Sequence, residues 1–416
     1  MRQQIASLFL LSFMLLAFLA RADGALTVTA RLSANDAVEG MLFGRQLAID
    51  GDTIAIGAEG SLATGVQQPA TFIFYRSSDG QWSQHQELPA GGSLSLQSGV
   101  LLVGDKVYRR DAAGAFVQRA RLRPADPQAD SGFGQAVALF ANGTRAAVGA
   151  PFASAGAVYV FERVSEGNWR QTAMLVAPQG SANDDFGLAL AAEGDVLLVG
   201  APIADGNGTA AAYLFVDDGE SWMLQRTFTG GNGMGWSVAI DGDTALIGSD
   251  GGSAYVYVRD QGGWSRQATL RPPAGLSGEF GFDVALEGDR ALIGFPPKQI
   301  SGFSAGATSS EPGRALVYER HDGTWSETAA TGPYEDSENL GVAVAMDDGK
   351  LLVADPETDA NGYERAGLVY VLSKSTQVPD EEGGSGALGP MILGLLLAAA
   401  IPLVRARRMR YLAAPS

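Results

Sequence analysis

The feature that most constrains the fold is an internal repeat of about 45 residues, a period typical of propellers and solenoids. Each copy begins with Phe-Gly, continues through an alternating strand and an Asp-Gly type of turn, and reaches a second apolar strand that ends in Gly-Ala-Pro. A variable loop, a strand with Tyr, a polar turn and a final strand that opens with Trp complete the copy. The copies that begin at Phe133 and Phe186 are the clearest.

Five more copies are degenerate. Four of them begin at Phe43, Gly235, Phe280 and Leu340, and the fifth keeps only the sequence from Ser98 onward. Each copy supplies four short apolar segments separated by turn dipeptides, which is the strand content of one propeller blade. The sequence therefore predicts an all-β, seven-bladed β-propeller of four-stranded blades over residues 23–374.

The two ends of the repeat region complement each other. The last copy stops after its third strand, GLVYVLSK from Gly367, whereas LTVTARL from Leu26 precedes the first copy and ends like FVQRARL of the degenerate copy. Because a closed ring leaves no sheet edge exposed at its ends, we expect the N-terminal strand to complete the last blade.

The recurring aromatic residues have a packing interpretation. Glycine after Phe lets two backbones approach closely where a ring packs, and proline after Gly-Ala ends the second strand because it has no N–H to donate. The tryptophans recur at one blade position, which favours packing over a shared ligand site; they are Trp82, Trp169, Trp222, Trp264 and Trp325.

Phe-Gly followed about a dozen residues later by Gly-Ala-Pro, repeated around a ring, resembles the FG-GAP repeats of the integrin α-subunit head and of bacterial exported proteins. The residues that carry this resemblance are Phe43, Gly44, Phe133, Gly134, Phe186, Gly187, Phe280 and Gly281. The resemblance implies that the loops after Gly-Ala-Pro and the linkers into the next Phe-Gly share one face. It also implies that recognition occurs there.

The acidic residues of that face are candidates for ligand contact. They are Asp126, Asp130, Asp184, Asp185, Glu335 and Asp336. They favour a cationic, sugar or cation-bridged ligand. The alternative is that acidic linkers only keep an exported protein soluble.

Integrin-like repeats carry a calcium loop between their first two strands, and this sequence departs from that pattern. It has tight turns such as Asp50-Gly51-Asp52, and a calcium ion needs six to eight oxygens from a loop that wraps it. We expect hairpin turns there and no cofactor. The weaker calcium candidates lie in the loops after the second strand, where any long turn also prefers such residues; they are Asp205, Asn207, Asp355, Asp359 and Asn361.

Both ends of the sequence indicate export. Residues 1–22 have the charge, apolar run and small-residue triplet of a signal peptide cut after Ala22, with an uncleaved anchor as the alternative. An acidic, glycine-rich linker at 375–386 leads into an apolar transmembrane segment at 387–404 and a basic cytoplasmic tail at 405–416.

This tail resembles a GlyGly-CTERM sorting signal, which implies a rhomboid-type protease as a partner and release to the surface of a Gram-negative bacterium. The alternative is a retained type I anchor, with the propeller outside the cytoplasm and the membrane contacted through the C-terminal segment.

Composition narrows the function. A net charge of −17 disfavours nucleic acid, and the absence of cysteine excludes disulfides and thiolate chemistry. Gly302-Phe303-Ser304-Ala305-Gly306 matches a hydrolase motif but falls in a long loop, and we expect the only histidines, His85 and His321, to be solvated. We predict no catalytic residues and a propeller that binds or adheres to a protein or glycan. A structural surface scaffold and an envelope-polymer hydrolase are the alternatives.

Overall fold

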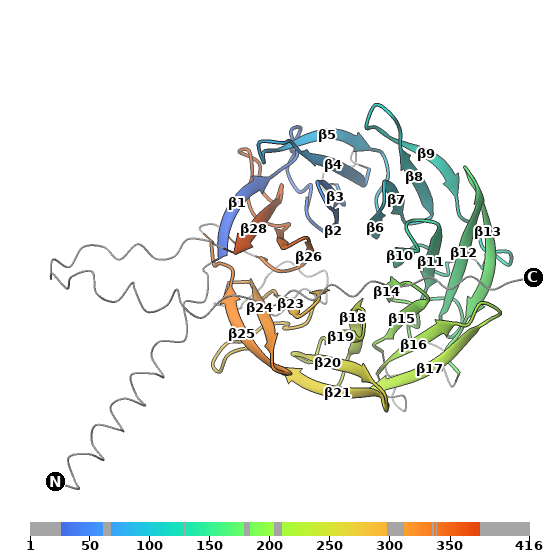
Figure 1. The fold of residues 1–416 in the computed structure, drawn as a ribbon. Coiled ribbons are helices and arrows are strands. Elements are labelled where there is room, and N and C mark those ends of the chain that lie inside the picture. Colours follow the sequence, from blue (N-terminus) through green and yellow to red (C-terminus); the bar gives the residue numbers. More distant parts are fainter. Residues whose placement is uncertain are drawn as a thin grey trace, which may run out of the picture. The chain divides into compact units, whose positions relative to one another are not determined.

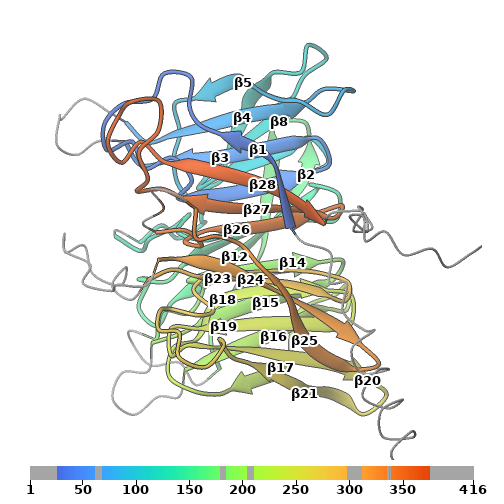
Figure 2. The ribbon, with the colours of Figure 1, turned by 90° about the vertical axis from the view of Figure 1, so that its left-hand side faces the viewer.

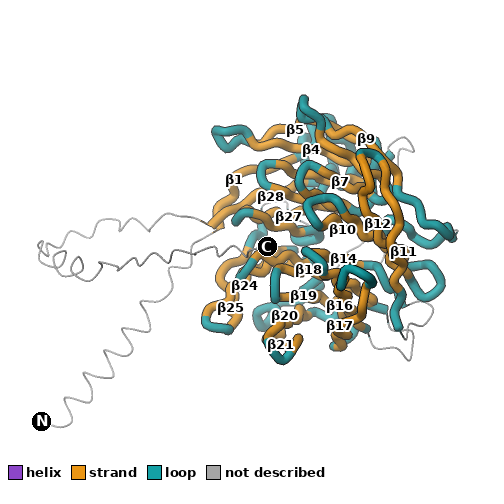
Figure 3. Tube along the Cα trace, turned by 45° about the vertical axis from the view of Figure 1, so that its right-hand side comes forward, coloured by secondary structure: helices purple, strands orange, loops and turns teal. Residues whose placement is uncertain are grey.

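The computed structural model describes residues 26–60, 68–128, 130–178, 184–203, 210–297, 312–334, 337 and 339–374. In these ranges every regular element is a strand, and the strands form seven four-stranded antiparallel sheets around one axis (Figures 1 and 3). This confirms the predicted seven-bladed, all-β propeller.

The blades follow the order of the repeats, and the first strand of each copy is the innermost. Blade 1 comprises β2 (Gln46–Asp50), β3 (Thr53–Ala58), β4 (Ala70–Arg76) and β5 (Trp82–Leu88). Blade 2 comprises β6 (Leu94–Gln97), β7 (Val100–Val103), β8 (Lys106–Arg110) and β9 (Phe116–Arg121). Blade 3 comprises β10 (Val137–Phe140), β11 (Arg145–Ala150), β12 (Ala157–Ser165) and β13 (Asn168–Leu175). Blade 4 comprises β14 (Ala189–Glu193), β15 (Val196–Ala201), β16 (Ala211–Asp217) and β17 (Trp222–Thr229). Blade 5 comprises β18 (Met234–Asp241), β19 (Thr244–Ser249), β20 (Ser253–Asp260) and β21 (Gly263–Leu270). Blade 6 comprises β22 (Val284–Glu287), β23 (Arg290–Phe295), β24 (Arg314–His321) and β25 (Thr324–Ala330). The degenerate second copy thus forms a complete blade.

The last blade takes its outer strand from the start of the chain. It contains β26 (Val344–Asp347), β27 (Lys350–Asp355), β28 (Leu368–Lys374) and β1 (Leu26–Leu32), in the sheet order β1-β28-β27-β26. Strand β1 runs antiparallel to β28, with Leu26 opposite Lys374 and Leu32 opposite Val369. The predicted closure of the ring by the N-terminal strand is therefore confirmed.

The hydrophobic core lies between blades rather than within one. Each of the seven apolar clusters draws residues from two adjacent blades, and one of them joins blade 7 to blade 1. The second strands β3, β7 and β19 are buried along their whole length, and those of the other blades are buried except for a half-buried first residue. Outer strands such as β1 and β5 alternate between exposed and half-buried positions. A blade therefore depends on both neighbours for its burial.

The Phe-Gly pairs are located at these junctions. The ring of Phe186 packs edge-on against Tyr213 and Phe215 of its own blade, at centroid distances of 5.5 and 6.1 Å. The next residue, Gly187, has φ of +95° and donates its N–H to Gly200 O at 2.9 Å. The same edge-on packing recurs at Phe43, Phe133 and Phe280.

The tryptophans of the outer strands also connect blades. Trp264 Nε1 donates to Gln225 Oε1 of the preceding blade at 3.0 Å, and Trp325 Nε1 donates to Gln267 Oε1 at 2.8 Å. Both indoles are buried, which agrees with the packing role expected from their recurrence.

The predicted signal peptide with its cleavage after Ala22 and the predicted tail from residue 375 onward lie outside the described residues. None of the regular elements in the described part of the chain is a helix that could span a bilayer.

Candidate functional site

The propeller presents two different faces. Because each blade is an antiparallel meander, the turn between its first and second strands and the hairpin between its third and fourth strands lie at one end (Figure 2). The loop between the second and third strands and the linker to the next blade lie at the other end. We call these ends the turn face and the loop face. The structure thus places the Gly-Ala-Pro loops and the linkers together, as the resemblance implies.

Side chains on the turn face connect neighbouring blades. The last residue of an inner strand accepts a hydrogen bond from a backbone N–H in the first turn of the next blade. This bond is present at six of the seven blade junctions, as Asp347 to Gly51 N (2.6 Å), Asp50 to Ser98 N (2.7 Å), Gln97 to Gly143 N (2.9 Å), Glu193 to Gly242 N (2.6 Å), Asp241 to Gly288 N, and Glu287 to Gly349 N (3.2 Å). We call these bonds the turn clasps; five of the six acceptors are carboxylates. The residues predicted as hairpin turns do form turns, and they also hold the ring together.

The junction between blades 3 and 4 is held differently. Arg145 of β11 forms an ion pair with Asp217 at the end of β16, and a second one with Asp195 at 3.7 Å. Its guanidinium also lies over the ring of Trp222 in blade 4, at 5.1 Å from the centroid. A cation on blade 3 thus joins the two blades at this junction.

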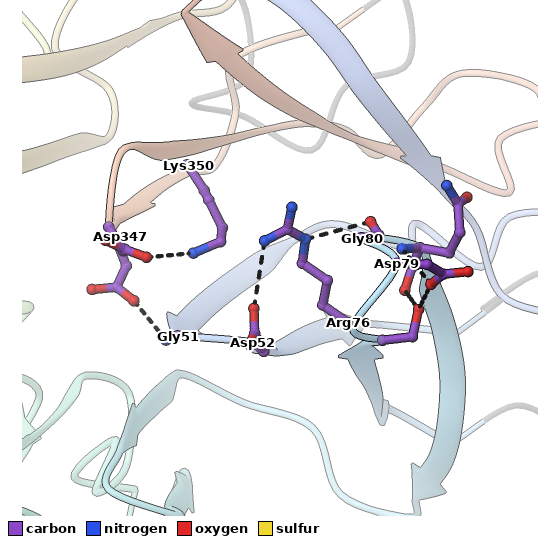
Figure 4. Close-up of polar contacts among 10 residues, drawn as sticks. Gly51, Asp52, Arg76, Asp79, Gly80, Asp347 and Lys350 are labelled. Carbon is purple, nitrogen blue, oxygen red and sulfur yellow. Dashed lines mark hydrogen bonds and ion pairs between the residues drawn. The ribbon is translucent and has the colours of Figure 1, made fainter.

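The second acidic residue of several turns pairs within its own blade. Asp52, Asp243 and Asp289 pair with Arg76, Arg259 and Arg320, which end the third strands of their blades or lie one residue from that end. Figure 4 shows the blade 7 to blade 1 junction, where Asp347 reaches Gly51 and Arg76 lies between Asp52 and Gly80. These carboxylates are occupied by protein groups, unlike those of a calcium loop.

A turn clasp should matter more than its neighbouring ion pair. Asp347→Ala leaves the Gly51 N–H without its charged acceptor and should lower the free energy of unfolding by about 1.5 kcal/mol. Asp52→Ala at the same junction removes an exposed pair at 3.7 Å and should cost less than about 0.5 kcal/mol. Chemical denaturation of the two variants measures the difference, and equal losses would show that the clasp has no special role.

On the loop face, four of the six predicted acidic ligand residues lie in the described part, on the linkers into blades 3 and 4. Asp126 and Asp130 are exposed, and Asp184 and Asp185 are half-buried. Burial, followed by the charge of Asp184, raises the pKa of Asp185. Glu335 and Asp336 lie outside the described residues.

Asp126 and Asp184 occupy comparable surroundings. Burial raises the pKa of Tyr159 in blade 3, and the charge of Asp126 adds to this effect. Burial also raises the pKa of Tyr213 in blade 4, and the charge of Asp184 adds to this effect. Each of these acids therefore lies near the Tyr of the third strand of its blade.

Exposed apolar side chains lie in the same region. Of the nine large hydrophobic residues that are exposed in the described ranges, eight lie on blades 2 to 4 or the linkers beside them, and Tyr363 is the exception. Phe152 and Ile203 directly follow the Ala-Pro of blades 3 and 4 and are 55% and 44% exposed, and Val176 starts the linker between these blades. We call Phe152, Val176, Ile203, Asp126 and Asp184 the blade 3–4 sector. The sequence contained Phe152 and Ile203 at matching positions, but their exposure did not follow from the repeat.

The described cation candidates are hydrogen-bonded to other groups of the protein. Asp355 is fully buried and accepts hydrogen bonds from Ser337 Oγ at 2.7 Å and Asn339 N at 3.0 Å. Asp359 accepts the Arg365 N–H, and the Asn361 amide donates to Ser33 Oγ and Ala34 O just after β1. Asp205 and Asn207 lie outside the described residues. Where the structure is described, it contains no group of three or more His, Asp or Glu residues arranged to hold a metal ion.

The two histidines considered for catalysis lie on different blades, in β5 of blade 1 and β24 of blade 6. His85 is exposed and contacts the ring of Tyr75 at a centroid distance of 4.8 Å. His321 is 74% exposed, with Nε2 at 3.8 Å from Glu319. Ser304 and its motif lie outside the described residues.

A cavity of about 570 Å³ occupies the axis of the ring at the loop-face end of the inner strands. Residues from all seven blades line it, among them Arg45, Gln135, Trp236, Phe282 and Asp283. Burial raises the pKa of Asp283 to about 7, although the Val344 and Val284 N–H groups oppose this shift by bonding to the carboxylate. Sequence analysis did not identify this residue; its signal is a single acid where other blades have Ala, Ser or Gln.

Comparisons with known proteins agree with this architecture. The sequence profile of the FG-GAP repeat matches residues 26–74, 116–161 and 169–215. A chain from the crystal structure of a mitotic checkpoint complex is similar with a TM-score of 0.53 at 12% identity, over 84% of this chain and 96% of that chain, and this likeness concerns the fold alone. A comparison with curated proteins gave no match.

Proposed function

We propose that this chain, a seven-bladed β-propeller in which three segments match the FG-GAP repeat, is a non-enzymatic binding module. Its fold is consistent with a binding or scaffold role. In our proposal the ligand is a protein or glycan, bound at the cell envelope through the blade 3–4 sector of the loop face.

The observation that carries this proposal is the location of Phe152 and Ile203. Exposed large apolar side chains are candidates for contact with a partner, because a partner removes their apolar surface from water. These two occupy the same blade position in adjacent blades, and Val176 lies on the linker between them.

The acids of the sector indicate the chemistry of the ligand. Asp126 and Asp184 provide negative charge on the linkers into blades 3 and 4, in a chain whose net charge is −17. Apolar contacts rimmed by carboxylates suit a ligand with both apolar and basic or hydroxyl-bearing groups, because charges at a rim select the partner while buried apolar groups supply affinity.

The envelope location is supported by the sequence at the two ends. The signal-like segment with its expected cleavage after Ala22 supports export. The apolar segment at 387–404 with its following arginines supports attachment to the membrane, or sorting to the surface by a rhomboid-type protease. Either outcome leaves the propeller outside the cytoplasm.

The test compares two faces of the same blade. The labelled propeller is applied to a glycan array and to biotinylated envelope proteins of the producing organism. Each buried large apolar side chain contributes about 1.5–3 kcal/mol, so Phe152→Ser with Ile203→Ser should weaken any ligand found by at least about tenfold. The control Val164→Ser removes a 57% exposed residue at the turn-face hairpin of blade 3 and should leave binding unchanged.

Two results would contradict the proposal. Equal effects of the double variant and of the control would mean that the sector does not hold the ligand. The absence of any ligand in both sets, with folded protein present at the envelope, would favour the structural scaffold instead.

A further inference from the structure

The axial cavity is a second feature that could hold a ligand, and it is separate from the blade 3–4 sector. Its wall repeats one position from every blade, the second residue after the motif glycine. This position is occupied by Gln46, Ser93, Ala136, Ala189, Ser237, Asp283 and Ala343. Six blades thus have a neutral residue there, and blade 6 alone has an acid.

The charges on the described part of this wall are not balanced. Among the described lining residues only three carry a charge, namely Arg45, Glu59 and Asp283. Arg45 and Glu59 form an ion pair with Nε and Oε1 3.0 Å apart. Among the described residues no cation pairs with Asp283, whose carboxylate accepts only the Val284 and Val344 N–H groups at 3.0 and 2.7 Å. The wall therefore has one uncompensated negative charge.

Two aromatic rings line the same cavity as Asp283. Phe282 directly precedes Asp283, and Trp236 lines the cavity from the neighbouring blade. Their ring centroids are 5.8 Å apart with planes inclined at 47°. Aromatic faces attract organic cations, Trp most strongly, and such rings grouped around a carboxylate form a common type of ammonium site.

We propose that the axial cavity binds a small organic cation of the quaternary or primary ammonium class, with Asp283 as its counter-ion and Trp236 and Phe282 as its apolar wall. The cavity volume lies within the usual range for small-molecule sites. One carboxylate supplies too few oxygens for a calcium or magnesium ion, which needs six or more ligands.

The titration of Asp283 agrees with this assignment. Burial without a compensating cation raises its pKa to about 7. A bound ammonium group would supply that cation and favour the ionised carboxylate. Since Arg45 and Glu59 balance each other, affinity should rise from pH 6 to pH 8 as Asp283 loses its proton, by up to about tenfold.

The experiment uses choline and its neutral carbon isostere, 3,3-dimethylbutan-1-ol, titrated into the full propeller by calorimetry or NMR. Choline should bind at least about tenfold more tightly than the isostere, because only choline gains the cation–aromatic and carboxylate attractions. Ethylammonium tests the primary amine, and glucose tests a neutral sugar.

The chain itself suggests the variants. Ala stands at the Asp283 position in blades 3, 4 and 7, and Leu188 stands at the Trp236 position in blade 4. Asp283→Ala should weaken choline binding by about tenfold and abolish its pH dependence, and Trp236→Leu should weaken it by about fivefold. Thermal melts check that both variants fold.

Three results would overturn the assignment. They are equal binding of choline and its isostere, choline binding unaffected by Asp283→Ala, and no ammonium ion binding at about 10 mM. Preference for glucose would likewise assign the cavity to sugars. None of these results depends on the loop-face ligand, so this proposal and the proposed function can fail separately.

Discussion

A chain that starts at Ser33, and so lacks strand β1, should lose roughly 5 kcal/mol or more of its free energy of unfolding relative to a chain that starts at Asp23. The loss arises because β28 becomes an open edge with several unpaired backbone groups, each contributing about 1 kcal/mol. The buried side chain of Leu32 also leaves the cluster shared by blades 7 and 1. Chemical denaturation of the two chains measures the loss.

Adding the peptide LTVTARL provides a second arm for this experiment. The peptide should bind the truncated ring at the edge of β28 and raise its melting temperature. The reason is that an added strand forms hydrogen bonds with the exposed backbone N–H and C=O groups of β28. Truncation should also promote association of the protein, because an unprotected edge pairs with other chains. Identical melting of the two chains would show that β1 does not close the ring in solution.

Gly187→Ala should be among the most damaging single substitutions, with a loss of about 2–4 kcal/mol. Gly187 has φ of +95°, and an added Cβ would lie 2.8 Å from Ala157 O and 3.0 Å from Val158 Cγ2 of blade 3. The strained φ costs about 1 kcal/mol, and the collision with backbone across a packed junction costs about 1–3 kcal/mol more.

The same blade provides a matched control. Gly194 also has a positive φ, +56°, but a Cβ there would meet nothing within 4 Å. Gly194→Ala should therefore cost only the backbone term of about 1 kcal/mol. Denaturation curves of the two variants separate the effect of the close approach from that of backbone strain. Similar losses of unfolding free energy would show that the close approach of the blades at Gly187 contributes nothing.

The fold could be predicted because its determinants are local and repeated. Phe-Gly, the turn dipeptides and the outer-strand tryptophans each mark a fixed point of a blade. The incomplete last copy matched the strand at Leu26, so even a pairing between the two ends of the repeat region was visible in the sequence. These signals depend on position within a repeat, and a repeat lets several weak copies support one another.

The site could be predicted only in outline. The placement of the acids on the loop face followed from the resemblance to FG-GAP repeats, but the turn clasps did not. Asp50 was interpreted as a turn residue, and its bond to Ser98 depends on how closely adjacent blades approach. The recurrence of an acid or amide before the turn in six blades could have suggested a shared partner.

Asp283 was missed for the opposite reason. This residue departs from the repeat, and a comparison of recurring residues does not identify a position at which one blade differs from the others. Its pKa also depends on desolvation, which arises only when seven inner strands surround one axis. Exposure of Phe152 and Ile203 likewise depends on which loops cover them.

The pairing of β1 with β28 also constrains the time course of assembly. Thr29 Oγ1 donates to Val371 O, an acceptor 342 residues away. Any process that delivers the chain from its N-terminus, such as synthesis or translocation, presents β1 first and its partner last. Six blades can form in order, but the first strand has no ladder to join until the final one emerges. Closure is therefore a late and long-range event, and we expect it to limit the rate at which the native ring appears.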